Sequence, residues 1–248
     1  MNLGIFDSGL GGLTVLKEIL KNNTYDKIIF YGDTINVPYG EKDRATLFEL
    51  AKQNVEFLRK KGADEIIAAC GTVSSNVLEP LKKEYDFNIL GIIDAACIEA
   101  EELTQNRKIG VIATNATIAS HAFKNKLKGY EVYEMPCPKF AVLIEQGKLD
   151  TKVMDEAIDE YLAPLKKEGI DTLILGCTHY PIIAEKIDKY LDGKVKLVNS
   201  GNVLSRELSN GNKKEPVLEF YVSGDVDIFK KNASMFLNVR ELEEVSNH

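Results

Sequence analysis

The feature that most constrains this chain is an internal repeat that ends on a cysteine in both copies. Residues 58–70 read LRKKGADEIIAAC, and residues 165–177 read LKKEGIDTLILGC. Leucine, lysine, glycine, aspartate and cysteine recur in register, and each matched pair lies 107 positions apart, as Cys70 and Cys177 do. The chain therefore reads as two copies of one unit, and each copy places a single thiol after an apolar strand.

The alternation of apolar runs with amphipathic stretches predicts the fold class. Strand-like and helix-like segments take turns, which is typical of a parallel sheet with helices on both faces. The runs LGIF, EIIAA and TLILG show little polar alternation, as expected of strands buried on both faces. We predict strands at residues 3–6, 27–31, 65–69, 89–93, 108–113, 131–134, 172–176, 195–198 and 217–222. We predict helices at residues 12–21, 44–61, 73–85, 95–103, 116–127, 152–168, 181–190 and 226–236.

The length of 248 residues suits either one large domain or two smaller ones, and the repeat favours two. The predicted strand and helix after residue 216 lie outside the repeat, and we assign them to the first domain. The first domain is then predicted to span 1–94 plus 207–248, and the second 95–206. The polar stretch 209–215, SNGNKKE, is predicted to be a loop.

Composition excludes several classes of protein. The net charge is −7 and no basic cluster is dense enough to follow phosphates, so we expect no binding to nucleic acid. No apolar run approaches the roughly 18–20 residues that cross a bilayer, so we expect no membrane association. Four cysteines in a chain without a secretion signal indicate reduced thiols and a cytoplasmic location.

The two repeated cysteines are the strongest candidates for chemistry. Ligands of open α/β sheets bind outside the carboxyl ends of the strands, where Cys70 and Cys177 are expected to lie. A helix is predicted to start after each of them, which favours the thiolate form. A single cysteine is commonly a small buried apolar residue, and we interpret Cys97 and Cys137 in this way. His179 lies two residues after Cys177 and is placed to relay or tune its proton.

Polar groups follow several other predicted strand ends and suit a zwitterionic ligand. Asp7 and Ser8 precede a glycine-rich turn whose amides suit a carboxylate, although a tight turn capped by Ser8 explains the same pattern. The loop GDTINVPYG ends on Tyr39 and Gly40. The hydroxyl groups that follow other strand ends belong to Thr72, Thr114, Thr117 and Thr178.

Two opposed thiols suit a reaction that removes a proton from one face of a carbon and returns one to the other face. A thiol with an ordinary pKa of about 8.5 can serve as either acid or base after a modest shift. The reaction class is then racemisation or epimerisation, and no cofactor fingerprint is visible. A zinc site would need more ligands at suitable spacing. A cysteine hydrolase needs one thiol and would not explain the second.

Several motifs closely resemble those of glutamate racemases, which are cofactor-independent enzymes that make D-glutamate for bacterial peptidoglycan. The resemblance covers nearly the whole chain, and it implies two similar three-layer α/β domains that are pseudo-symmetric and face each other across a cleft. The motifs are LGIFDSGLGGLTVLKEI at 3–19, GDTINVPYG at 32–40, AACGTVSSN at 68–76, IGVIATNATI at 109–118, LIEQGKL at 143–149 and LGCTHYPII at 175–183.

The resemblance also implies roles for individual residues. Cys70 and Cys177 match the two acid/base thiols, Asp7 and His179 match the groups beside them, and Glu145 matches a glutamate that orients the histidine. It implies no cofactor, no metal site, glutamate as the small-molecule partner, and a homodimer as one mode of assembly. The implied substrate contacts are Asp7, Ser8, Tyr39, Gly40, Gly71, Thr72, Thr114, Thr117 and Thr178.

Gly71 departs from the family pattern, which usually has asparagine after the first cysteine. Glycine removes an amide donor that helps to hold the substrate, a loss worth about 1.5–3 kcal/mol unless Ser74, Ser75 or a water compensates. Two alternatives therefore stay open: a racemase of aspartate or another amino acid, and a weakly active relative with a binding role. The motif CTHY favours glutamate. Residues 94–96 also differ, with DAA where the family often has Glu-Pro-Gly.

Overall fold

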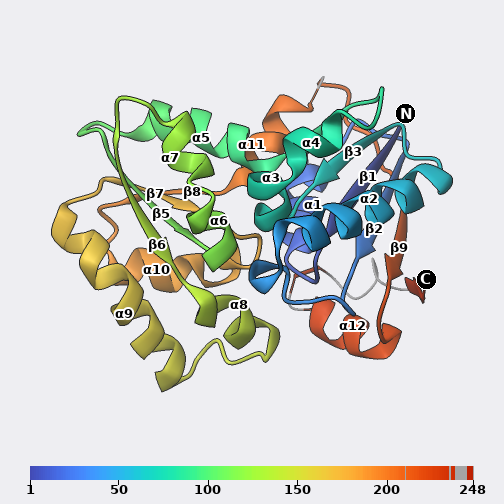
Figure 1. The fold of residues 1–248 in the computed structure, drawn as a ribbon. Helices are drawn as coiled ribbons and strands as arrows, with labels where there is room; N and C mark the ends of the chain where they lie inside the picture. The colour runs from blue at the N-terminus through green and yellow to red at the C-terminus, as the bar shows by residue number, and fades with distance from the viewer. Residues whose placement is uncertain (210, 235, 238–244, 248) are drawn as a thin grey trace.

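The computed structural model describes residues 1–209, 211–234, 236–237 and 245–247. Two separate parallel sheets lie beside each other with helices packed around them (Figure 1). The strand order is β10-β9-β2-β1-β3-β4 in the first sheet and β6-β5-β7-β8 in the second. The predicted fold class, two similar α/β units with parallel sheets, is confirmed.

The first sheet is assembled from both ends of the chain. β9 pairs with β2 over its whole length, from Lys27 opposite Val217 to Gly32 opposite Val222. The C-terminal strand that we assigned to the first domain thus lies in the first sheet, while the domain boundaries themselves stay a prediction. The strands are β1 (Asn2–Asp7), β2 (Lys27–Gly32), β3 (Glu65–Ala68), β4 (Ile89–Gly91), β9 (Val217–Val222) and β10 (Val245–Asn247).

The second sheet repeats the central pairing of the first. β1 pairs with β3 so that Leu3 lies opposite Glu65, and β5 pairs with β7 so that Ile109 lies opposite Thr172. Glu65 and Thr172 lie 107 positions apart within the repeat, and the segments 3–9 (LGIFDSG) and 109–115 (IGVIATN) form a shorter echo with an offset of 106. The repeat is therefore structural. The strands are β5 (Lys108–Ala113), β6 (Glu131–Pro136), β7 (Thr172–Leu175) and β8 (Lys196–Val198).

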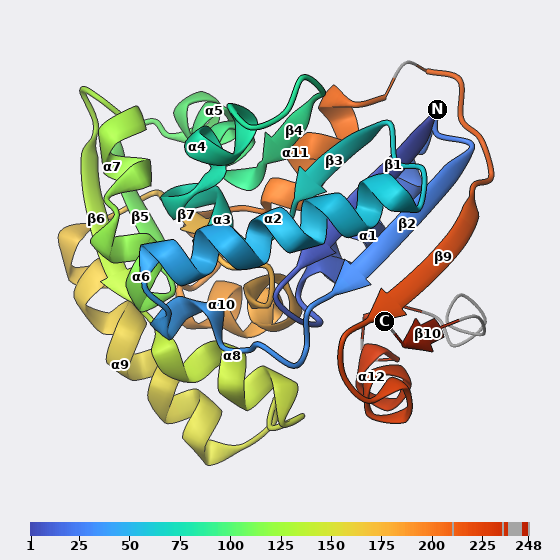
Figure 2. The same cartoon turned by 45° about the vertical axis from the view of Figure 1, so that its right-hand side comes forward.

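Helices cover both sheets and also fill the space between them. α11 packs against α1 of the first half and α5 of the second, and the buried core continues from Leu3 and Ile5 to Leu173 and Leu175. Figure 2 shows α2 lying across the strands of the first sheet. The helices are α1 (Gly12–Lys21), α2 (Arg44–Lys60), α3 (Gly71–Asn76), α4 (Leu78–Lys82), α5 (Ile92–Leu103), α6 (Asn115–Ala119), α7 (Ala122–Lys126), α8 (Pro138–Glu145), α9 (Lys152–Glu168), α10 (Ala184–Tyr190), α11 (Ser200–Glu207) and α12 (Val226–Ala233). Short 3₁₀ helices span Tyr39–Glu41 and Tyr180–Ile183.

Several predicted elements were wrong in their extent. The predicted strand 89–93 ends at Gly91, because α5 begins at Ile92, whose amide bonds the Ser74 hydroxyl. The predicted helix 73–85 breaks at Val77, and the helix 116–127 breaks at His121, whose φ of 52° is left-handed. The helices α8 and α11 and the strand β10 were not predicted.

The predicted C-terminal elements extend in part beyond the residues that the structure describes. The predicted helix 226–236 ends at Ala233 in the structure, and residue 235 lies outside the described residues. Residue 210 of the predicted loop, and residues 238–244 and 248 of the predicted first domain, also lie outside them. Within the described part of the chain, no helix is both long and apolar enough to cross a membrane.

Candidate functional site

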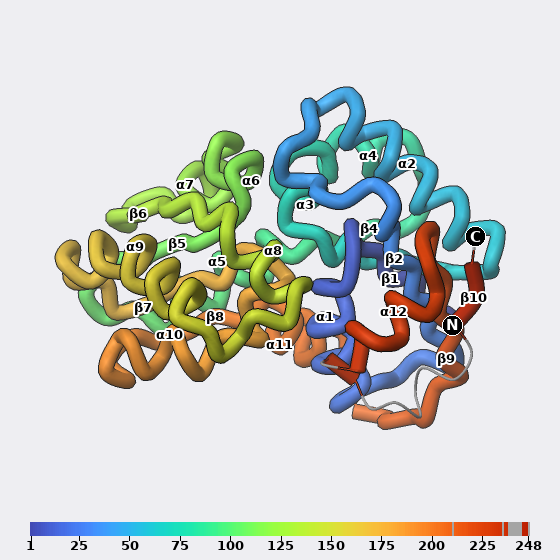
Figure 3. Tube along the Cα trace, turned by 90° about the horizontal axis from the view of Figure 1, so that it is seen from below, coloured from blue at the N-terminus to red at the C-terminus, as the bar shows by residue number. Residues whose placement is uncertain are grey.

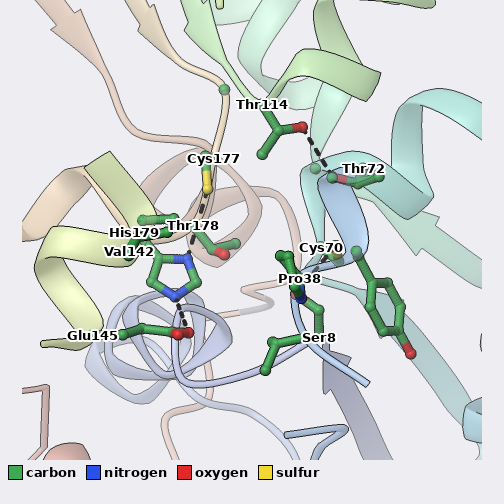
Figure 4. Close-up of a pocket in the computed structure, with 16 residues that line it drawn as sticks. Ser8, Pro38, Cys70, Thr72, Thr114, Val142, Glu145, Cys177, Thr178 and His179 are labelled. Atoms are coloured by element: carbon green, nitrogen blue, oxygen red, sulfur yellow. Dashed lines mark hydrogen bonds and ion pairs between the residues drawn. The ribbon is translucent and has the colours of Figure 1, made fainter. Parts of the chain in front are cut away.

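A small cavity lies where the carboxyl ends of both sheets meet, and both repeated thiols line it (Figure 4). Its water-accessible volume is about 60 Å³. The predicted site residues in its wall are Ser8, Tyr39, Gly40, Cys70, Gly71, Thr72, Thr114, Glu145, Cys177, Thr178 and His179. Asp7 and Thr117 are fully buried behind this wall. The remaining lining residues were not predicted: Val37, Pro38, Ala141, Val142 and Gly176.

The first thiol is buried and neutral. Cys70 stands just before α3 with 4% of its surface exposed, and its sulfur donates to the Ser8 hydroxyl at 3.7 Å. Burial raises the pKa of Cys70 to about 12, and the nearby Asp7 carboxylate adds to this effect. The expectation that the helix start would favour a thiolate is therefore wrong for Cys70, because desolvation outweighs the hydrogen bond from the amide of Val73.

The second thiol begins a chain of three groups. The Cys177 sulfur lies 3.6 Å from Nδ1 of His179, and Nε2 of that ring lies 2.9 Å from Oε1 of Glu145. Figure 4 shows the sulfur, ring and carboxylate in line. Burial disfavours a charged imidazole, but Cys177 and Glu145 together hold the pKa of His179 well above its usual value. Both partners thus favour the protonated ring, which directs one N–H at each of them.

Asp7 connects the first strand to the turn that precedes α1. It is fully buried, and its Oδ2 accepts from the amides of Gly9 at 3.1 Å and Gly12 at 3.0 Å. Oδ1 accepts from the Thr178 hydroxyl at 3.4 Å. Two amides of the predicted carboxylate-binding turn are thus occupied by the chain's own carboxylate. The alternative interpretation, with Ser8 as helix cap, is wrong, because α1 has no side-chain cap. That the turn binds a ligand carboxylate stays a prediction.

Burial sets the protonation of Asp7. It raises the pKa of this carboxyl group, against the lowering effect of His179 and of the two amides. A buried carboxylate with a raised pKa costs folding free energy when it is ionised. The chain keeps this group near Cys70 and bonded to Thr178 despite that cost.

A chain of hydroxyl groups crosses from one half of the molecule to the other beside the cavity. Thr72 in α3 lies 3.0 Å from Thr114, which lies 2.9 Å from Thr117 in α6. Ser75 extends the chain by donating to Thr117 at 3.4 Å. Because a hydroxyl can both donate and accept, these groups can exchange their mutual bonds for bonds to a ligand carboxylate.

The Tyr39 hydroxyl does not serve the cavity. It donates to Asp33 at 2.6 Å and accepts from Asn54 at 3.1 Å, so only the rest of Tyr39 forms the wall. Asp33 also accepts from Ser223, which follows β9, at 2.8 Å. Sequence reasoning missed Asp33, although its place directly after a buried strand was the available signal.

We expect Glu145→Gln to lower the pKa of His179. The substitution keeps a hydrogen-bond acceptor but removes the negative charge beside the imidazolium, one of the groups that raise this pKa. The titration of the ring carbons by NMR measures the change, and with only three histidines in the chain the signals are readily assigned. His121, which bonds Glu134 instead, serves as the internal control. An unchanged His179 titration would contradict the assigned role of Glu145.

Comparisons with known proteins agree with this geometry. A family model described as Asp/Glu/Hydantoin racemase matches residues 24–208. The glutamate racemase of Aquifex pyrophilus is 44% identical over 214 residues, which are 85% of this chain and 83% of that protein. The structure of glutamate racemase isoform RacE1 from Bacillus anthracis has a TM-score of 0.91 and 31% identity, covering 99% of this chain and 96% of that one. The glutamate racemase of Francisella tularensis subsp. tularensis SCHU S4 in complex with D-glutamate has a TM-score of 0.86 and 35% identity, with coverages of 99% and 95%.

Proposed function

Because this chain belongs to the Asp/Glu/hydantoin racemase family and is an amino-acid racemase, an isomerase, we propose that it interconverts L- and D-glutamate by a two-thiol mechanism. The observation that carries the mechanism is the placement of Cys70 and Cys177 in the wall of one cavity. They follow repeat-equivalent strands of two different sheets. The names of the relatives support glutamate as the substrate.

In the proposed reaction, one thiolate removes the α-proton and the other thiol donates a proton to the opposite face. For D-glutamate, Cys70 takes the proton, the Cα–H electron pair stays on the planar carbon and its carboxylate, and the S–H of Cys177 supplies the new proton. The roles exchange for L-glutamate. The products are the opposite enantiomer and a swapped pair of sulfur protonation states, so no external proton is consumed.

The substrate itself helps to activate Cys70 in this proposal. With a pKa raised to about 12, the Cys70 thiol is neutral at pH 7 before a substrate binds. The α-ammonium group of the substrate brings a positive charge into the same small cavity, and an opposite charge within about 4–6 Å favours the thiolate. On the other side, the His179 ring already lies against the Cys177 sulfur. Each thiol thus has a different source of positive charge.

We propose that the reaction needs no cofactor. The planar carbanion would be stabilised by exclusion of water and by the hydroxyl groups around its carboxylate. A role in supplying D-glutamate for peptidoglycan, in the cytoplasm, follows from the resemblance. The four cysteines are free in the structure, which is compatible with a reducing compartment.

Aspartate is the second candidate substrate, and one observation favours it. Gly71 provides no side-chain donor in the cavity wall. Aspartate is shorter than glutamate by one methylene group, and one methylene in a pocket is worth about 1–3 kcal/mol of discrimination. The two amino acids are therefore tested side by side.

Incubation in D₂O is the experiment that tests the proposed function. The protein, dialysed against a chelator and supplied with no cofactor, should exchange the α-proton of L-glutamate and abolish its optical rotation. L-Aspartate in a parallel incubation should react at a lower rate. Exchange with aspartate alone would replace the proposed substrate, and exchange with neither at high enzyme concentration would refute racemisation.

A further inference from the structure

Four glycines of the first half meet atoms of the second half around the cavity. We call them the glycine seam: Gly9, Gly11, Gly40 and Gly71. A Cβ atom on Gly40 would lie 2.9 Å from Cβ of Thr114, and one on Gly9 would lie 3.0 Å from Oε1 of Glu145. Seen from below in Figure 3, the two halves lie side by side. Gly40 and Gly71 of the seam also line the cavity.

The seam needs glycine for space and not for backbone conformation. None of the four has a φ in the left-handed region, where glycine is otherwise favoured. A Cβ on Gly11 would lie 2.3 Å from the Thr178 hydroxyl and 2.5 Å from Nδ1 of His179. These separations are shorter than the usual contact distance between non-bonded carbon atoms, which is about 3.5–4.0 Å. Any side chain would therefore have to displace the opposite half or its side chains.

Gly71 differs from the other three because its neighbour is backbone. Its Cβ would lie 2.4 Å from the carbonyl oxygen of Gly176, which cannot rotate away as a side chain can. Gly71 directly follows Cys70, and Gly176 directly precedes Cys177. The contact between the two glycines is therefore also the contact between the two cysteine-bearing turns.

We propose that Gly71 sets the spacing of the two thiols by letting the Cys70 turn close directly onto the carbonyl of Gly176. The importance of this spacing rests on the proposed two-thiol function, because both sulfurs must reach one carbon from opposite faces. With the two turns placed as they are in this chain, glycine at position 71 is a requirement of their closure and not simply a missing amide donor. Any side chain at position 71 of this chain would meet the Gly176 carbonyl and hold the two turns farther apart.

This proposal makes opposite predictions from the missing-donor explanation. If Gly71 only lacks a donor, Gly71→Asn should lower KM and leave kcat unchanged. If Gly71 sets the spacing, Gly71→Ala and Gly71→Asn should both lower kcat. A misplacement of about 1 Å costs on the order of 10²-fold in rate, so the expected loss in both variants is about 10²-fold.

Thiol accessibility gives a readout that does not depend on activity. The folded variants are treated with N-ethylmaleimide without substrate, and labelling of each cysteine is followed by mass spectrometry. Opening of the seam should speed labelling of Cys70 and Cys177 by about 10-fold or more, because protection of a closed site is lost in proportion to its open population. Cys97, which is buried in α5 and does not line the cavity, reports on global unfolding in the same sample.

Gly110→Ala is the matched control. Its new methyl group meets only side-chain ends of its own half, Cδ1 of Ile170 at 2.6 Å and Cδ1 of Leu173 at 2.9 Å. Cys70 and Cys177 of this variant should be labelled at the same rate as in the wild type. In Gly40→Ala, the new methyl group meets the side chain of Thr114, so labelling of the two site cysteines should speed up less than in Gly71→Ala. This variant replaces Gly71→Ala in the test if no substitution at position 71 gives a folded protein.

The outcomes separate the proposals. Faster labelling of both site cysteines with lower kcat in both position-71 variants supports the role of Gly71. A lower KM for Gly71→Asn, with unchanged kcat and labelling, overturns it. Faster labelling in a protein whose wild type racemises neither glutamate nor aspartate would leave the seam in place and refute the proposed function instead.

Discussion

Alanine in place of either Cys70 or Cys177 should abolish racemisation, with kcat lowered by about 10²–10⁴-fold or more in both directions. This range is the usual contribution of a positioned acid or base, and each thiol is the sole such group proposed for its face of the carbon. Optical rotation, started separately from L- and D-glutamate, measures the loss. The effect should be equally severe in the two directions, because a racemisation in either direction uses both thiols.

Two further measurements make this prediction specific. Each single variant keeps one thiol, so it should still exchange the α-proton of one enantiomer with D₂O while retaining configuration. Cys97→Ala, in α5 and outside the cavity wall, should racemise like the wild type. Substantial racemisation by either site variant would refute the two-thiol mechanism.

Asp7→Asn should separate stability from activity. The pKa of Asp7 is raised, so its contribution to the free energy of unfolding is fully present below the ordinary carboxyl pKa and is lost as the pH rises through the raised value. Asparagine stays neutral and can still accept from the amides of Gly9 and Gly12. We therefore expect Asp7→Asn to be as stable as the wild type, or more stable, at pH 7. Its kcat/KM should fall by about 10²-fold.

Melting temperatures across pH 3–8 test the stability part, with Asp7→Ala as the contrasting variant. Alanine leaves the two buried amides without their partner, at a cost of about 1–3 kcal/mol. The wild type should lose stability relative to Asp7→Asn as the pH rises, while Asp7→Ala should be the least stable throughout. Equal destabilisation by asparagine and alanine at every pH would show that the charge carries no cost.

The sheets and the placement of the thiols were predictable from the sequence, because both follow from local patterns. Apolar runs with little alternation specify strands buried on both faces, and the repeat carries the same register into both sheets, as the pairs Leu3–Glu65 and Ile109–Thr172 show. The carboxyl end of each central strand then fixes where Cys70 and Cys177 lie.

What could not be predicted depends on which groups meet after folding. The sequence places glycine amides beside Asp7, but only the packed structure decides that Asp7 itself takes them. The same holds for Cys70, whose protonation is set by desolvation and not by the helix that follows it. α8, which positions Glu145, was missed because Cys137 and the prolines beside it were not interpreted as a helix start, although Pro138 occupies its first turn.

The pairing of β9 with β2 has a consequence for how the protein is made. β2 pairs with β1 on one side and ends at Gly32, but β9, its neighbour on the other side, begins only at Val217. The second sheet, in contrast, is built from one uninterrupted stretch, 108–198. At about 5–20 residues per second, a ribosome needs roughly 10–40 s between the two strands. During that time the side of β2 that faces away from β1 is an unpaired edge, open to other chains. The half that is synthesised first is therefore the half that is completed last, and it is the one that a chaperone would have to protect.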